Sequence, residues 1–134
     1  MSEATEVKDD RRYTKDHEWA LQKGSELVIG ISAFAVDQLG DITLVNWNVA
    51  VGERVEAGQV FGTIESVKTL SDLFAPVGGK ILRLNAELEA APERVNEDCW
   101  DAGWMVAIQP DDPAVLSQLL SPAAYREHIA SLEH

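Results

Sequence analysis

Residues 59–79 read QVFGTIESVKTLSDLFAPVGG, and this stretch decides the fold of the chain. The segments 59–65 and 70–75 carry the β-branched, aromatic and leucine residues that are typical of strands. Pro76 ends the second segment, because proline cannot donate a hydrogen bond to a sheet ladder. The stretch therefore predicts two strands joined by a tight turn over 66–69.

The sequence on both sides of this hairpin also predicts β structure. Residues 18–22 and 26–31 form a second candidate hairpin around Lys23-Gly24-Ser25, because glycine favours a tight turn. Further strands are expected over 41–47, 80–84 and 104–108. The predicted fold class is therefore mainly β, with short helices added.

Four short helices are expected. Ser32 is a suitable N-cap for a helix that Gly40 would end, and Asn85 is a candidate N-cap for a helix over 86–91. Two more helices should close the chain, because an N-cap residue precedes proline at each of two places, Asp112-Pro113 and Ser121-Pro122.

Length and composition indicate one soluble domain. The chain has 134 residues, 46% of them hydrophobic, which suffices for a core. Its net charge of −12 argues against nucleic acid and anionic membranes as partners. The sequence shows neither the ~20 apolar residues of a membrane span nor the basic and apolar regions of a signal peptide, so we expect a cytoplasmic protein. We also expect a monomer.

The chain is expected to have three parts. Residues 1–11 are polar and charged and predict a flexible N-terminal lead. Residues 12–131 should form a single domain that includes the C-terminal helices. Residues 132–134 read Leu-Glu-His and are interpreted as a possible remnant of an affinity tag.

No catalytic or metal-binding set of residues is visible in the sequence. His17, His128 and His134 do not stand at ligand spacing with one another or with Cys99, so no zinc site is expected. Cys99 has no adjacent base and is interpreted as a small buried residue. His17 and Glu18 are neighbours, but neighbours in a strand point to opposite faces. We therefore expect a protein that is not an enzyme.

The turn at 66–69 is unusual. It reads Ser-Val-Lys-Thr and contains none of the Gly, Asn or Asp that short hairpins usually need. It places Lys68 at the apex, far from other groups and open to a modifying enzyme. On geometry alone, an ordinary solvated lysine is the favoured interpretation.

The sequence around this lysine resembles the lipoylation hairpin of the glycine cleavage system H proteins. The matching residues are Glu65-Ser66-Val67-Lys68, then Ser71-Asp72 and 75–79. The resemblance runs in order from Tyr13 to Tyr125, almost the whole chain. It includes Tyr13-Thr14-Lys15-Asp16-His17-Glu18-Trp19, Ile29-Gly30-Ile31, Leu39-Gly40-Asp41-Ile42, Gly58-Gln59-Val60-Phe61-Gly62, Val95-Asn96-Glu97-Asp98, Gly103-Trp104 and Ala124-Tyr125.

This resemblance implies a fold and a modification. The fold is a barrel-sandwich hybrid of two antiparallel sheets, as in lipoyl domains. Lipoic acid would be amide-linked to Lys68. Glu65 and the turn residues Ser66, Val67 and Thr69 would serve recognition by the lipoate-attaching enzyme.

The resemblance also implies a function for the arm. The lipoyl group would shuttle the aminomethyl group of glycine from glycine decarboxylase to an aminomethyltransferase, and dihydrolipoamide dehydrogenase would reoxidise it. The carrier itself would catalyse nothing. The loaded arm would fold into a cleft at Glu18 and Asp72, whose carboxylates suit a cationic amine.

The chain departs from the family pattern at positions that bear on partners. Trp47-Asn48 stands where Leu-Pro is usual, Cys99-Trp100-Asp101 where Pro-Tyr-Gly is usual, and Thr69-Leu70 where small residues are commoner. Trp47 and Trp100 are interpreted either as packing substitutions or as interface anchors.

These departures leave other functions open. One is an H-protein-like lipoate-binding protein that carries sulfur intermediates in heterodisulfide-reductase-like sulfur oxidation. Others are a donor of lipoate to 2-oxoacid dehydrogenases and an unmodified interaction module of the same fold. A biotin carrier is disfavoured, because Val67 and Thr69 flank the lysine where such carriers have methionine.

Overall fold

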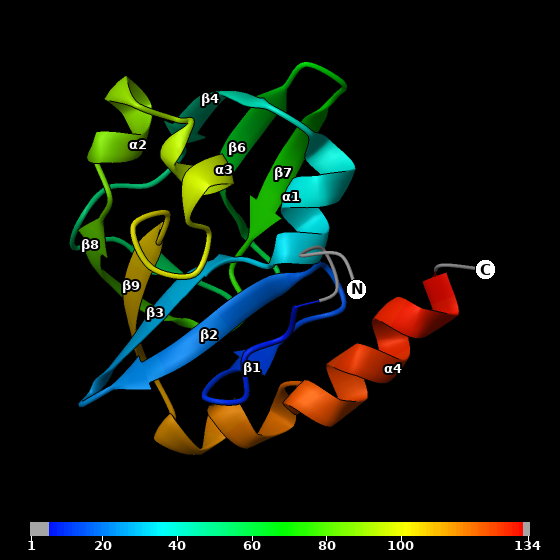
Figure 1. Cartoon of the computed structure of the whole chain (residues 1–134). Coiled ribbons are helices and arrows are strands. Elements are labelled where there is room, and N and C mark those ends of the chain that lie inside the picture. Colours follow the sequence, from blue (N-terminus) through cyan, green and yellow to red (C-terminus); the bar gives the residue numbers. More distant parts are fainter. Residues whose placement is uncertain (1–5, 133–134) are drawn as a thin grey trace.

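The computed structural model describes residues 6–132, whose strands form two antiparallel sheets (Figure 1). The larger sheet has the order β1-β2-β3-β9-β8-β5 and the smaller one the order β4-β6-β7. The strands of the larger sheet are β1 (Arg12–Tyr13), β2 (Glu18–Lys23), β3 (Glu26–Ile31), β9 (Val106–Pro110), β8 (Gly79–Leu84) and β5 (Arg54–Val55). Those of the smaller sheet are β4 (Ile42–Trp47), β6 (Val60–Ser66) and β7 (Leu70–Phe74). The predicted mainly β class is confirmed.

Short helices connect and cover the sheets. They are α1 (Ala33–Leu39), α2 (Glu87–Ala90), α3 (Arg94–Glu97), a 3-10 helix (Pro113–Gln118) and α4 (Pro122–Leu132). The predicted cap of α1 is confirmed, because the Ser32 hydroxyl accepts a hydrogen bond from the backbone N–H of Ala35 at 3.3 Å. Gly40 ends α1 and donates its N–H to the carbonyl of Val36.

The predictions for residues 85–97 were partly wrong. Asn85 does not cap α2, because its side-chain amide donates to the carbonyls of Ala102 and Trp104, at 3.1 and 2.7 Å. The N-cap of α2 is Ala86, which makes no side-chain bond. The helix α3 was not predicted, since a four-residue helix offers too few positions for a 3.6-residue period to show.

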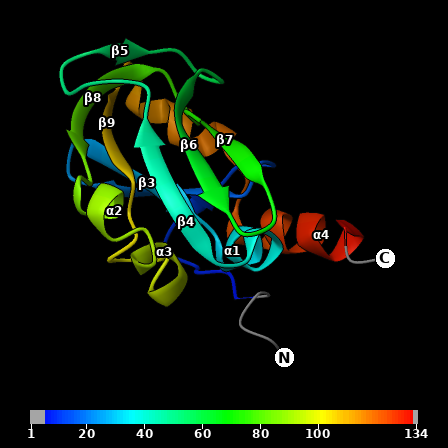
Figure 2. The same cartoon turned by 90° about the horizontal axis from the view of Figure 1, so that it is seen from above.

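The two sheets enclose the main hydrophobic core. Ile29 of β3, Ile64 and Phe61 of β6, and Ile81 of β8 are all fully buried. Burial of a side chain of this size stabilises the fold by about 1.5–3 kcal/mol. A second cluster lies beneath α4, where the Tyr125 ring stacks on Tyr13 with centroids 4.4 Å apart. The helix α4 is thereby fixed to the edge of the larger sheet (Figures 1 and 2).

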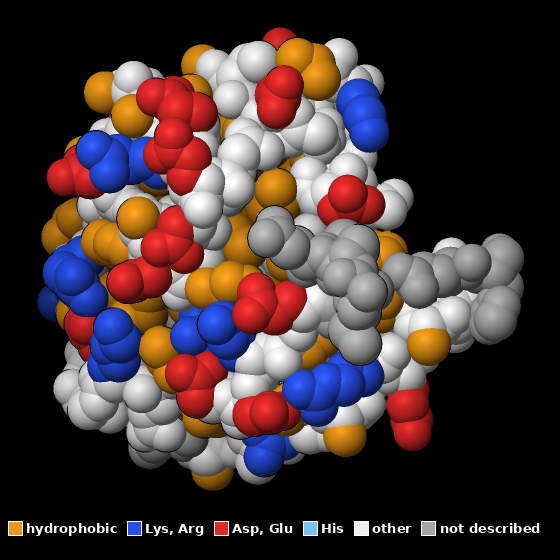
Figure 3. Space-filling view, in the orientation of Figure 1, with side chains coloured by type: hydrophobic (Ala, Val, Ile, Leu, Met, Phe, Trp, Pro, Cys, Tyr) orange, Lys and Arg blue, Asp and Glu red, His pale blue; other side chains and the backbone are white. Residues whose placement is uncertain are grey.

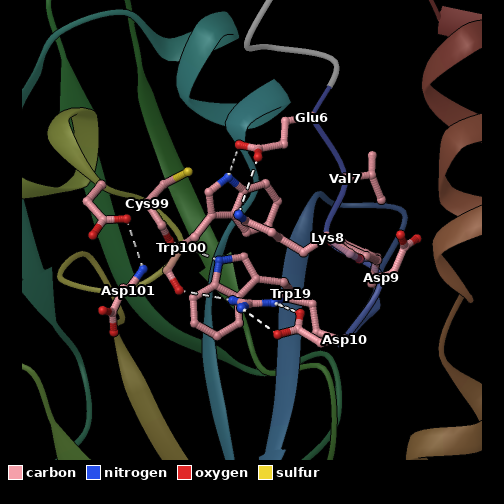
Figure 4. A network of polar contacts seen from close by, with 12 residues as sticks. Glu6, Val7, Lys8, Asp9, Asp10, Trp19, Cys99, Trp100 and Asp101 are labelled. Carbon is pink, nitrogen blue, oxygen red and sulfur yellow. Dashed lines mark hydrogen bonds and ion pairs between the residues drawn. The ribbon is translucent and has the colours of Figure 1, made fainter.

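The described part of the predicted N-terminal lead packs against the loop that follows α3 (Figure 4). The Arg11 guanidinium lies over the rings of Trp19 and Trp100, at 4.6 and 5.4 Å, and donates to the Trp100 carbonyl. The Glu6 carboxylate accepts from the indole of Trp100 at 2.8 Å. Residues 6–11 are therefore held by specific contacts, whereas residues 1–5 lie outside the described part of the chain.

Of the proposed tag remnant, residues 133–134 lie outside the described residues. Within residues 6–132, no helix combines the length and the apolar character needed to cross a bilayer.

Candidate functional site

The turn at the tip of the β6–β7 hairpin is closed by a serine side chain. The Ser66 hydroxyl accepts hydrogen bonds from the backbone N–H groups of Lys68 and Thr69, both at 3.1 Å. The Ser66 backbone N–H also donates to the Thr69 carbonyl at 2.8 Å. A serine hydroxyl can replace the local bonds that Asn or Asp supply in other turns. This explains how a tight turn forms without glycine.

The apex does not stand free, as the sequence had suggested, but rests against the end of α1. The Val67 backbone N–H donates to the carbonyl of Asp41 at 3.0 Å. A Cβ built on Gly40 would lie 3.3 Å from Cε of Lys68 and 3.6 Å from Cγ2 of Val67. Figures 1 and 2 both show the hairpin tip beside α1. The backbone of Lys68 is therefore fixed in place, while its side chain stays exposed.

Apolar side chains are exposed around this apex. In the smaller sheet, Glu65 of β6 pairs with Leu44 of β4 on one side and with Leu70 of β7 on the other. Leu44 and Leu70 are 45% and 63% exposed, and Val67 at the apex is 67% exposed. Hydrophobic and charged side chains meet at this end of the molecule (Figure 3). Clustered exposed apolar residues are typical of surfaces that contact a partner.

A cleft of about 130 Å³ lies between β2, α1 and the β6–β7 hairpin. Glu18 and Asp72 both line it, so the structure brings these two sequence-predicted residues to one site. Leu39 and Ile64 add apolar surface. Leu39 directly precedes Gly40, which adjoins the Lys68 stem, so the cleft begins close to the lysine.

Glu18 is the buried acid of this cleft, with an exposed fraction of only 3%. Its carboxylate accepts from the Thr14 hydroxyl at 2.8 Å and from the Phe74 backbone N–H at 3.2 Å. Burial raises the pKa of Glu18 to about 7, although these two hydrogen bonds act in the opposite direction. The ion pairs found within residues 6–132 do not include Glu18. A cationic group in the cleft would therefore find an uncompensated acid.

His17 also lines the cleft, although the sequence predicts that His17 and Glu18 point to opposite faces of one strand. This prediction is wrong, because β2 begins only at Glu18 and His17 has a φ of 73°. This left-handed backbone turns both residues toward the same cleft. His17 Nδ1 lies 2.8 Å from the Tyr125 hydroxyl, which lies 2.6 Å from the Ser32 hydroxyl. Burial lowers the pKa of His17, which favours the neutral imidazole.

Three of the residues that depart from the family pattern, Trp47, Cys99 and Trp100, pack within the fold, whereas Leu70 is exposed. Trp100 is half-buried and covered by Arg11 and Glu6. Trp47 is half-buried and stacks on Phe61 with ring centroids 6.3 Å apart. Cys99 is buried, and burial raises the pKa of its thiol to about 12, which keeps it protonated and unreactive. These contacts support the packing interpretation of both tryptophans.

Known proteins are similar to this chain over nearly its whole length. The sequence profile of the family described as Glycine cleavage H-protein matches residues 11–132. The chain is 53% identical over 125 residues to a glycine cleavage system H protein of Chlorobium limicola, covering 92% of this chain and 97% of the relative. It is 46% identical over 128 residues to that of Anaeromyxobacter sp. (strain K), covering 96% and 99%.

A solved structure has the same fold. The crystal structure of a glycine cleavage system H protein from Mycobacterium marinum aligns with a TM-score of 0.81 at 34% identity, over 96% of this chain and 100% of that chain. The barrel-sandwich architecture predicted from the sequence is thus confirmed.

Proposed function

This chain belongs to the glycine cleavage H-protein family, and from that premise we propose that Lys68 carries lipoic acid in amide linkage. The protein is a lipoyl-carrying shuttle of the glycine cleavage system. The sulfur-oxidation and unmodified-module alternatives are not favoured, because the chain is similar to glycine cleavage system H proteins over nearly its whole length. The exposed Lys68 at the apex of a fixed hairpin is the observation that carries the site assignment.

The residues present fit a lipoyl arm. Lys68 is exposed, so its amine is open to an attaching enzyme, while its backbone N–H is bound by the Ser66 hydroxyl. A cleft of about 130 Å³ lies near the lysine, and Leu39, Ile64 and other apolar side chains in its walls suit a hydrocarbon chain. The Glu18 carboxyl within it is buried without a basic partner among the described residues.

The chain's own groups would bind and shield the arm. Attached lipoate supplies a disulfide that can accept and release the one-carbon amine derived from glycine. Glu18 would hold a cationic amine in the cleft, since a positive charge beside it favours the ionised carboxylate and lowers its pKa. Asp72, exposed at the rim, would add a second negative charge. The apolar walls would exclude water. None of these steps requires the carrier to act as a catalyst.

The partners follow from this role. We propose a lipoate-attaching enzyme that contacts Glu65, Ser66, Val67 and Thr69, and then glycine decarboxylase, the aminomethyltransferase and dihydrolipoamide dehydrogenase as successive hosts of the arm. Tethering raises the effective concentration of the arm at each active site. Cytoplasmic location and a monomeric state stay predictions.

The test is the intact mass of the whole chain from lipoate-fed cells that contain a lipoate ligase. We expect one lipoyl group per chain, lost in Lys68→Arg and kept in Lys23→Arg, which changes the lysine beside the other hairpin turn. Peptide mapping should place the group on Lys68. A bare wild-type protein in the presence of an active ligase would refute the proposal.

The partner assignment needs a separate assay. Lipoylated protein mixed with purified glycine decarboxylase should support exchange of bicarbonate with the glycine carboxyl carbon, and bare protein should not. A lipoylated sample without such activity would contradict the glycine cleavage assignment but leave the Lys68 assignment intact.

A further inference from the structure

Asn96 joins α3 to the corner between α1 and β4. Its side-chain carbonyl accepts from the Ile42 backbone N–H at 2.8 Å, and its side-chain amide donates to the Gly40 carbonyl at 2.9 Å. We propose that Asn96 is a positioning residue for Lys68. It holds the backbone of residues 40–42, on which the apex of the hairpin rests.

The contacts lead from Asn96 to the lysine in two steps. The corner that Asn96 binds, Gly40 to Ile42, also contains the Asp41 carbonyl, which accepts from the Val67 N–H at 3.0 Å. Val67 directly precedes Lys68, and the lysine stem lies over Gly40. Loss of the Asn96 bonds would therefore release the surface that fixes the apex.

The segment that carries Asn96 is itself firmly held. Val95 is fully buried, and a Cβ added to Gly103 would lie only 3.0 Å from the Val95 Cα, so the two backbones are in close contact. The loop that follows α3 is anchored where the Trp19 indole donates to the Cys99 carbonyl at 3.0 Å (Figure 4). Asn96 thus connects this packed region to the backbone of residues 40–42, against which the apex of the β6–β7 hairpin rests.

The side-chain amide of Asn96 satisfies both backbone groups at once. The Ile42 N–H needs an acceptor and the Gly40 carbonyl needs a donor, and an amide offers one of each. Aspartate has nearly the same shape but offers acceptors only, so it keeps the bond to Ile42 and loses the bond to Gly40. Alanine loses both. The series Asn96, Asn96→Asp and Asn96→Ala therefore removes the bonds one at a time.

Asn85 provides a matched control. Its side chain is buried and also makes two hydrogen bonds to backbone groups, the carbonyls of Ala102 and Trp104. These residues lie between α3 and β9, and neither contacts the Lys68 hairpin through a bond described for the chain. Asn85→Ala should lower the stability of the fold as Asn96→Ala does, without disturbing the apex.

The first measurement does not depend on the lipoyl group. Amide hydrogen exchange of the bare protein is followed by NMR at Val67 and at Ile108 in β9. In Asn96→Ala, we expect exchange at Val67 to accelerate roughly tenfold relative to Ile108, as for a local opening. Asn96→Asp should lie between Asn96→Ala and wild type, and Asn85→Ala should leave the ratio unchanged. An unchanged ratio in both Asn96 variants would overturn the proposal.

The second measurement rests on the proposed modification of Lys68. With a purified lipoate ligase, we expect kcat/KM for the protein acceptor to fall roughly tenfold in Asn96→Ala, which removes both Asn96 hydrogen bonds. Asn85→Ala should stay at the wild-type value. Equal losses in both variants would show a merely structural role. If Lys68→Arg is still modified, the proposed function fails, whereas normal modification of both Asn96 variants overturns only the inference about Asn96.

Discussion

Two hairpins of this chain have turns of similar length that are held in different ways. The β2–β3 hairpin turns at Gly24 and Ser25, and Gly24 has a φ of 64°, which favours glycine. The β6–β7 hairpin turns over residues 67–69, where the Ser66 hydroxyl takes the place of a glycine. Nothing lies within 4 Å of a Cβ built on Gly24, whereas the second apex rests on Gly40.

The two turns hold an apical side chain in different ways. In the β2–β3 hairpin, glycine adopts the positive φ of the turn without contacts from other elements, so the tip can project into solvent. A turn held by tertiary contacts keeps its apex at one place relative to the rest of the fold. Both hairpins carry an exposed lysine, Lys23 and Lys68. Lys23 lines a surface pocket with Trp19 and Trp104, whereas Lys68 stands at an apex that tertiary contacts hold near the Glu18 cleft.

The largest loss of stability expected from a substitution comes from adding a methyl group to Gly40 or to Gly24. Gly40→Ala and Gly24→Ala each force alanine to a positive φ, at a cost of about 1–3 kcal/mol. Gly40→Ala should lose more, because the φ of 79° and ψ of −151° at Gly40 lie in a region that essentially only glycine adopts, and the Lys68 stem would have to give way slightly, whereas the new Cβ in Gly24→Ala meets open space. Urea unfolding measures both losses. A greater loss in Gly24→Ala would contradict the view that only the second apex depends on tertiary contacts.

A second prediction concerns the pH dependence of stability, which should come from Glu18 at the start of β2 and not from the β2–β3 turn at its other end. The pKa of Glu18 rises from its ordinary value of 4.5 to about 7 on folding. The folded protein then binds the proton more tightly than the unfolded chain, so the free energy of unfolding falls as pH rises from about 4.5 to 7. A shift of this size corresponds to on the order of 3 kcal/mol.

NMR can locate this titration. The Phe74 amide, which donates to Glu18, should change its chemical shift with a midpoint near pH 7, while the Gly24 amide at the far end of β2 should not respond. Glu18→Gln should abolish the change at Phe74 and flatten the pH dependence of stability in that range. A midpoint at Phe74 close to 4.5 would show that Glu18 is not desolvated.

A smaller effect is expected from the two turn serines. Ser66→Ala removes the acceptor for the N–H groups of Lys68 and Thr69, and the free energy of unfolding should fall by about 1–2 kcal/mol. Ser25→Ala changes an exposed serine in the glycine turn and should have an effect within about 0.5 kcal/mol. Thermal unfolding of the pair measures the difference. If Ser66→Ala and Ser25→Ala lower the free energy of unfolding equally, the Ser66 hydrogen bonds make no net contribution to stability.

The smallest change in stability should come from Val67→Thr. Val67 is 67% exposed, so the substitution should alter the free energy of unfolding by less than about 0.5 kcal/mol. If Val67 serves recognition, the rate of lipoyl attachment should nevertheless fall. Val51→Thr, at a valine 63% exposed and away from the hairpin, should change neither quantity. Normal attachment in Val67→Thr would remove this residue from the recognition surface.

Much of the fold could be predicted because its signals are local. The strand segments, the Ser32 cap of α1 and the glycine turn at Gly24 each depend on residues within a few positions of one another. The wrong predictions arose where a long-range contact or an unusual backbone conformation overrode the local signal. Asn85 looks like an N-cap, but its side chain bonds instead to carbonyls 17 and 19 residues away. His17 looks like a strand residue, but it lies before β2 with a left-handed backbone.

The family, the two hairpins and the place of Lys68 at an apex follow from the order of the residues alone. The place where that apex rests, and the groups around it, depend on how the sheets and helices pack. The Asn96 bonds to Gly40 and Ile42 span 56 and 54 positions, and Glu18 binds the Phe74 N–H across 56. Such pairs leave no periodic or turn signal in the sequence, because they form only after the sheets pack. The cleft beside Lys68 is therefore a product of packing, although the residues that line it were already in the sequence.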